Sequence, residues 1–221
     1  MALPGWDVVT SYGGSAVELC AAAIGLGRWR RIAGGQRLIT IWFVAAALGD
    51  VAVFVTAKVL HNTQPAARVW FALSVVFALE ALAAFQHDNR RVVAFRVAIG
   101  VYLVAWGGLA MIVEPLTTLS TYSSPLHALV ILTAAVLTLL RRASLGRGDL
   151  FMDPGFLIAA GLAGYAVASV LEALVGQLWL HDAPQYVNAY YATSNIVTAL
   201  AEAVIIKALF LPPNSSRRSS P

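Results

Sequence analysis

The sequence predicts an all-α membrane protein with seven transmembrane helices. Three observations support this fold class: the composition, a series of long apolar runs, and basic residues that fall in alternate gaps between those runs. Of the 221 residues, 59% are hydrophobic and only 12% are charged. Soluble globular domains carry about 25% charged residues, so this composition excludes an ordinary soluble domain.

Seven apolar runs are each about long enough to cross a hydrocarbon core of ~30 Å as a helix. Only helices and closed β-barrels can span a lipid bilayer, and these runs lack the alternation of polar and apolar residues that barrel strands show. The fifth run is short unless Ser123–Pro125 begins it. The expected spans are Val8–Leu26, Leu38–Leu60, Ala66–Phe85, Val92–Val113, Leu126–Leu140, Phe156–Leu180 and Tyr186–Leu211.

All Lys and Arg residues except Lys58 and Arg68 lie in alternate gaps or at the C-terminal end. Short loops rich in Lys and Arg stay in the cytoplasm, which predicts an outside N-terminus and a cytoplasmic C-terminus. The basic residues form no stripe with interleaved aromatics, so we expect no nucleic-acid partner. The alternate groups are Arg28, Arg30, Arg31 and Arg37; Arg90, Arg91 and Arg96; Arg141, Arg142 and Arg147; and Lys207, Arg217 and Arg218.

We expect one membrane domain over residues 1–211 and a disordered cytoplasmic tail over residues 212–221, which read PPNSSRRSSP. Within the domain, the second and third spans resemble the sixth and seventh. LGDVAVFVTAKVL parallels LAGYAVASVLEALV, and the helix that follows each carries an aromatic residue and an acid. A parallel repeat of three helices, one linking helix and three more would produce this pattern.

Five carboxylates are predicted at membrane depth, namely Glu18, Asp50, Glu80, Glu172 and Glu202. An acid near a bilayer centre costs about 2.5–3.5 kcal/mol on insertion scales. None should face lipid comfortably, and no Arg is expected at mid-membrane to pair with them. Each therefore needs an internal partner, water or a proton.

Two helices carry polar stripes that should face the bundle interior. Tyr191, Asn195, Thr198 and Glu202 recur at helical spacing in the last span, as do Ser11, Ser15 and Glu18 in the first.

Two interpretations of the acids stay open. In the functional one they line a cavity for protons or cations, with Asp50, Glu80 and Glu202 as the strongest candidates. In the structural one they are neutral acids that hydrogen-bond helices together. The two are evenly balanced for a single acid, but five acids together favour a polar cavity, because interhelical hydrogen bonds average only ~0.6 kcal/mol.

Other site chemistries have weaker support. A retinal protein needs a lysine deep in the last helix, and Lys207 lies close to Pro212. The histidines are scattered and are expected in loops or at interfaces, so we expect no metal, and no cofactor is predicted. Catalysis has no positive signal, although an enzyme that uses only carboxylates stays possible. The four histidines are His61, His87, His127 and His181.

The runs ELCAAAIGLGRWRRI, RVWFALSVVFALE and AYYATSNIVTALAEAVIIKALFLPP, with Asp50 in the second helix, resemble small uncharacterised bacterial seven-helix membrane proteins. The resemblance covers nearly the whole length and implies a membrane domain in a bacterial inner membrane, but no activity. This chain departs from the pattern before the third helix, where HNTQPAAR replaces an Asn pair.

The leading hypothesis is a multi-pass inner-membrane carrier or channel for a small solute, coupled to protons through Asp50, Glu80 and Glu202. Tyr191, Asn195 and Thr198 would line the route. The expected partners are the lipid bilayer and the solute or proton. The alternative is a sensor or partner-binding subunit that associates with another membrane protein or a second copy. A third possibility is a lipid-modifying enzyme.

Overall fold

A computed structural model describes residues 6–32, 34–86, 88–118, 121–145, 149–182 and 187–212. Side chains are described for these ranges except 6–13, 174–182 and 187–191. The predicted tail lies outside the described residues apart from Pro212. The main helices are α1 (Trp6–Gly27), α2 (Gly35–Val59), α3 (Gln64–Ala83), α4 (Asn89–Gly108), α5 (Ser123–Ser144), α6 (Pro154–Asp182) and α7 (Val187–Phe210).

The described residues form seven α-helices and no strand, which confirms the predicted all-α class. Six of the helices are long and apolar enough to cross a membrane, whereas the described apolar part of α1, Gly14–Gly27, is shorter. The fifth helix begins at Ser123, so it has the extra turn that a full span requires. The fourth continues into a π-helical turn, Leu109–Val113, and a short 3-10 helix, Leu150–Met152, precedes α6.

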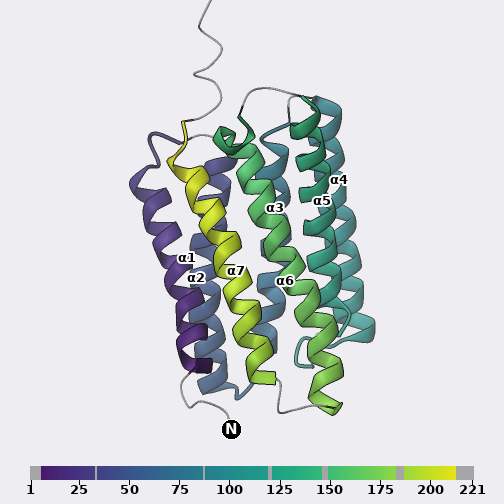
Figure 1. The fold of residues 1–221 in the computed structure, drawn as a ribbon. Helices are drawn as coiled ribbons and strands as arrows, with labels where there is room; N and C mark the ends of the chain where they lie inside the picture. The colour runs from purple at the N-terminus through teal and green to yellow at the C-terminus, as the bar shows by residue number, and fades with distance from the viewer. Residues whose placement is uncertain are drawn as a thin grey trace, which may run out of the picture.

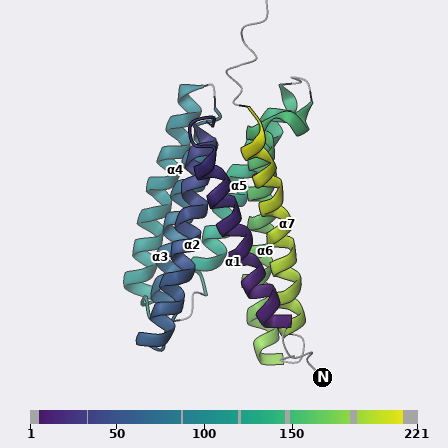
Figure 2. The ribbon, with the colours of Figure 1, turned by 90° about the vertical axis from the view of Figure 1, so that its left-hand side faces the viewer.

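Six helices form a closed ring in the order α1, α2, α3, α5, α6, α7, and α7 contacts α1 again. The fourth helix stands outside this ring and packs mainly on α3 (Figure 1). Figure 2 shows that α1 runs obliquely, beside α2 at one end and beside α7 at the other. The first helix therefore links the two sides of the bundle.

The α1–α2, α3–α4 and α5–α6 connections and the end of α7 lie at one end of the bundle, which we call the arginine end (Figure 1). Here Arg28 Nε donates to Leu209 O at 3.0 Å and Gln36 Nε2 donates to Ala208 O at 2.8 Å. The last carbonyls of a helix have no partner within it, so these side chains satisfy the end of α7. They also fix α1 and α2 against it.

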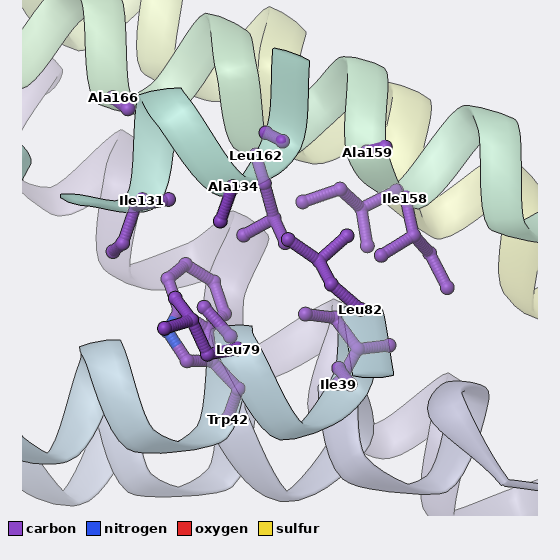
Figure 3. Packing of buried hydrophobic residues seen from close by; sticks show 14 of the residues in the cluster. Ile39, Trp42, Leu79, Leu82, Ile131, Ala134, Ile158, Ala159, Leu162 and Ala166 are labelled. Atoms are coloured by element: carbon purple, nitrogen blue, oxygen red, sulfur yellow. The ribbon is translucent and has the colours of Figure 1, made fainter. Parts of the chain in front are cut away.

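The buried core lies between α2, α3, α5 and α6, as Figure 3 shows for Ile39 and Trp42 opposite Ile158 and Leu162. Glycines allow α6 and α7 to approach closely. A Cβ added at Gly161 would lie 2.6 Å from the carbonyl oxygen of Ala201. Membrane helices in lipid have no hydrophobic driving force to associate. Small residues at such contacts allow the close van der Waals packing that holds the helices together.

Large apolar side chains cover much of the outer surface. On and after α4, Val104, Met111 and Ile112 are 78%, 89% and 85% exposed. Soluble monomers rarely expose contiguous apolar patches larger than a few hundred Å². This surface is compatible with an integral membrane protein, in which lipid tails cover these side chains.

Candidate functional site

Three of the five predicted acids come together in the bundle. Glu18 of α1 lies within electrostatic range of Asp50 of α2 and Glu202 of α7, and Glu202 lies within range of Asp50. The Ser15 hydroxyl donates a hydrogen bond to Asp50 Oδ2. We call Glu18, Asp50 and Glu202 the carboxylate cluster.

Helix packing brings these side chains within electrostatic range of one another. Ser15 and Glu18 are one turn apart on α1 and share a face. On the other side of the bundle, a Cβ added at Gly164 of α6 would lie 3.1 Å from Ala201 Cβ of α7. The next residues along the two helices are Tyr165 and Glu202, and Tyr165 lies within electrostatic range of Glu18 and Glu202.

The Glu202 side chain is fully buried, with 0% exposure. Neither of its carboxyl oxygens has a hydrogen-bond partner among the described residues, and Glu18 Oε2 is buried without one. Burying a polar group without a partner is costly, and a charge costs more. A proton, water or a bound solute is therefore required at this position.

Asp50 differs from Glu202 because its side chain is exposed. Glu18 and Ser15 are half-buried, so exposure falls from Asp50 through Glu18 to Glu202. The cluster thus reaches from the surface of the bundle to a fully enclosed carboxyl group.

Aromatic rings line the enclosed side of the cluster. The Tyr165 ring contacts the Trp42 ring edge-on, with centroids 5.3 Å apart, and Trp42 lies 5.6 Å from Trp70. His127 of α5 stacks on Phe71 at 4.8 Å and lies 6.2 Å from Tyr165. The indole Nε1 of Trp42 and Nε2 of His127 are also buried without a partner among the described residues.

Glu80 lies outside the carboxylate cluster. Its Oε1 forms an ion pair with Arg96 Nε of α4 at 3.2 Å, and the two side chains are 30% and 64% exposed. The sequence grouped Glu80 with Asp50 and Glu202, and no intramembrane arginine was expected. The α3–α4 hairpin supplies Arg96, since Glu80 lies about one turn before the end of α3 and Arg96 lies two turns after the start of α4.

The remaining predicted residues lie around the cluster. Glu172 of α6 is exposed and within electrostatic range of Tyr165. Asn195 and Thr198 are half-buried on α7, two turns and one turn before Glu202. The side chain of Tyr191 lies outside the described part of the chain.

No basic side chain is ion-paired with the carboxylate cluster in the described ranges. The ion pairs there join Arg68 to Glu114, Arg91 to Asp88, Arg96 to Glu80 and Arg142 to Asp153. The same residues contain no group of three His, Cys, Asp or Glu side chains that could hold a metal ion. The carboxylates of the cluster can accept a proton or a cationic group.

Sequence reasoning missed Trp42, Tyr165 and His127. Trp42 and Tyr165 lie in apolar spans that contain several aromatic residues, so no local pattern distinguishes them from aromatic residues that only pack in the core. His127 was expected near the outer end of the fifth span, in a loop or at the interface, but it is 1% exposed inside α5. The sequence contained one signal for this burial: if the fifth span starts at Ser123, His127 lies one turn inside it.

Comparisons with protein-family models, curated proteins and solved structures found no match to this chain.

Proposed function

We propose that this chain is an integral membrane carrier or channel for a small solute, coupled to protons through the carboxylate cluster. The observation that supports the proposal most directly is the convergence of Glu18, Asp50 and Glu202 from three helices in the absence of an ion-paired base among the described residues. Neutral acids that only join helices would each be expected to hold a hydrogen-bond partner, and Glu202 holds none there.

The gradient of exposure across the cluster gives each carboxylate a role. Asp50, the least buried of the three, is where a proton enters or leaves the cluster, and the Ser15 hydroxyl orients its carboxylate. Glu18 passes them inward, and Glu202 holds a proton or a cationic group of the solute in the enclosed part. Asn195 and Thr198 line the route along α7.

The proposal includes a parallel repeat of three helices, with α4 as the link. In such a repeat, α1, α2 and α3 correspond to α5, α6 and α7. The contacts of the ring agree with this correspondence, since the α1–α2 contact matches α5–α6 and the α3–α5 contact matches α7–α1. The peripheral position of α4 fits a linker. In repeat-built transporters the substrate site lies at the interface between the halves, and Glu18 and Glu202 meet where α1 packs on α7.

We further propose a bacterial inner membrane as the location, with the arginine end in the cytoplasm. The grouping of Arg28 and Arg142 at the same end as the last turn of α7 supports this orientation.

The proposal is tested in proteoliposomes that contain a pH-sensitive dye, with a pH gradient imposed and the membrane potential clamped by valinomycin. The wild-type protein should carry protons, and Glu202→Gln should abolish the flux because the amide cannot release a proton. Glu80→Gln is the matched control, since it makes the same change at an acid outside the cluster and should keep the wild-type rate. Equal rates for the wild type and Glu202→Gln, or loss in both variants, would remove the proposal.

A further inference from the structure

A groove on the outside of the bundle runs between α4 and α5, with α3 as its floor. Its volume is about 360 Å³, within the range of about 300–1,000 Å³ that ligand pockets occupy. Leu79 of α3 forms the buried floor, while Ala98 of α4 and Leu137 of α5 are exposed along its rims. The groove arises because α4 packs on α3 and makes few contacts with α5.

The walls of the groove are apolar. Thr133 carries the one hydroxyl group among the lining side chains, and it donates to Leu129 O of its own helix at 2.8 Å. No polar side chain of the wall is therefore left to bind a polar ligand. From Leu129 to Leu137 the groove follows α5 for about 12 Å at 1.5 Å per residue, less than half of a hydrocarbon core of ~30 Å. These dimensions fit an alkyl chain within one leaflet.

Two arginines stand at one end of the groove. Arg90 lies one turn before the lining residue Ala94, and Arg141 lies one turn after the lining residue Leu137, so each shares a helix face with the wall. Both are at the arginine end, because α4 begins there and α5 ends there.

These two arginines differ from their neighbours in having no carboxylate partner in the described part of the chain. The neighbouring arginines of α4 and α5 are each paired with an acid. Those pairs are Arg91–Asp88, Arg96–Glu80 and Arg142–Asp153. An unpaired positive charge is thus concentrated where the apolar groove meets the end of the bundle.

We propose that the groove binds one acyl chain of an anionic glycerophospholipid, with Arg90 and Arg141 holding its phosphate headgroup. Guanidinium groups match phosphate in charge and geometry, and basic residues just beyond a membrane helix attract anionic lipid. This inference does not depend on the proposed transport activity.

Native mass spectrometry of the full chain in detergent provides the test, with phosphatidylglycerol and phosphatidylcholine of identical acyl chains as the two probes. One phosphatidylglycerol should remain bound in preference to phosphatidylcholine. Arg90→Gln with Arg141→Gln should weaken phosphatidylglycerol binding by roughly fivefold per arginine. Phosphatidylcholine binding should fall less, because its choline cation offsets the charge of its phosphate. Arg30→Gln with Arg31→Gln, which removes two exposed charges at the same end away from the groove, is the matched control.

A second pair of variants tests the groove itself. Ala98→Leu fills it and should reduce the binding of both lipids, whereas Ala105→Leu, also exposed on α4 but outside the lining, should not. Equal binding of the two lipids, equal loss in the Arg30/Arg31 control, or unchanged binding in Ala98→Leu would each overturn the proposal.

Discussion

Arg68 of α3 and Glu114, which follows the π-helical turn after α4, form a buried ion pair. The Nη2–Oε2 distance is 3.5 Å, and the side chains are 0% and 5% exposed. Arg68 also donates to the carbonyl oxygens of Glu114 and Thr118, and Glu114 Oε2 accepts from the backbone N–H of Ser123 at 3.2 Å. The pair therefore fixes the α4–α5 connection and the first turn of α5 against α3.

Glu114→Gln should strongly destabilise the protein, because it leaves the Arg68 charge buried without its partner. Removing one member of a buried pair costs about 3–5 kcal/mol. Glu80→Gln breaks the exposed pair with Arg96 and should cost about 0–1 kcal/mol. Thermal unfolding in detergent, followed by circular dichroism, compares the two variants, and equal midpoints would contradict this account of the connection.

Gly161→Ala should destabilise the contact between α6 and α7. The new Cβ would overlap Ile205 Cγ1 and lie 2.6 Å from Ala201 O, and the backbone atom cannot move aside cheaply. Overpacking of this kind costs about 1–3 kcal/mol. Gly100→Ala on α4 is the control, since nothing lies within 4 Å of its Cβ, and the change should be neutral or stabilising. The midpoints of thermal unfolding should separate the two variants, and an unchanged midpoint for Gly161→Ala would contradict the close approach.

The spans could be predicted from the sequence because length and apolarity are local properties. The arrangement of the spans could not, since it depends on contacts between distant residues. Nothing near Asn89 or Gly108 indicates that α4 lies outside the ring. The pairing of Arg68 with Glu114 was hidden for the same reason, because it joins the first turn of the expected third span to the residue that follows the fourth.

The candidate site was predicted in part. The spacing of Ser15 and Glu18 on one helix face indicated a polar surface, and Glu202 was identified from its stripe on α7. The expected depth in the membrane could not separate Glu80 from the acids of the carboxylate cluster, since depth does not indicate which face of its helix an acid occupies. Arg96, which the sequence marked as a topology signal, turned out to be the partner that removes Glu80 from the cluster.

Ser15→Ala should slow proton flux without abolishing it, because it removes the hydrogen bond to Asp50 but keeps the carboxylate. Asp50→Asn should be the more severe change. Ser15→Thr, which restores a hydroxyl group, should recover much of the rate. Ser144→Ala is a suitable control, since its hydroxyl bonds only Arg141 O of its own helix, at 2.8 Å. The dye assay in proteoliposomes ranks the four variants, and a faster rate for Asp50→Asn than for Ser15→Ala would contradict the role given to Asp50.

His127→Phe should be tolerated or even stabilising. The imidazole stacks on Phe71, and its Nε2 is buried without a partner in the described residues, whereas its Nδ1 lies 3.3 Å from Ser124 O. A phenyl ring keeps the stacking and removes the unsatisfied atom at the loss of this one long contact. Replacing an unpaired buried polar group by an apolar one of similar shape is nearly neutral or favourable. His127→Ala should instead cost several kcal/mol, because it leaves a cavity between α3, α5 and α6. Thermal unfolding distinguishes the two, and a large loss in His127→Phe would mean that Nε2 binds water or a solute.

The charge pattern predicts that fusions at the C-terminus report a cytoplasmic location. A green fluorescent protein fused after Pro221 should fluoresce in a bacterial inner membrane, whereas alkaline phosphatase at the same point should be inactive. Fusing the phosphatase within the α2–α3 connection, after Leu60, should make it active, because that connection lies at the end opposite to the last turn of α7 (Figure 1). Reversing the bias by changing Arg28, Arg30 and Arg31 to Gln should lower the fluorescence of the C-terminal fusion. Phosphatase activity at the C-terminus of the unaltered chain would show that the arginine end faces away from the cytoplasm, and the proposed orientation would then be wrong.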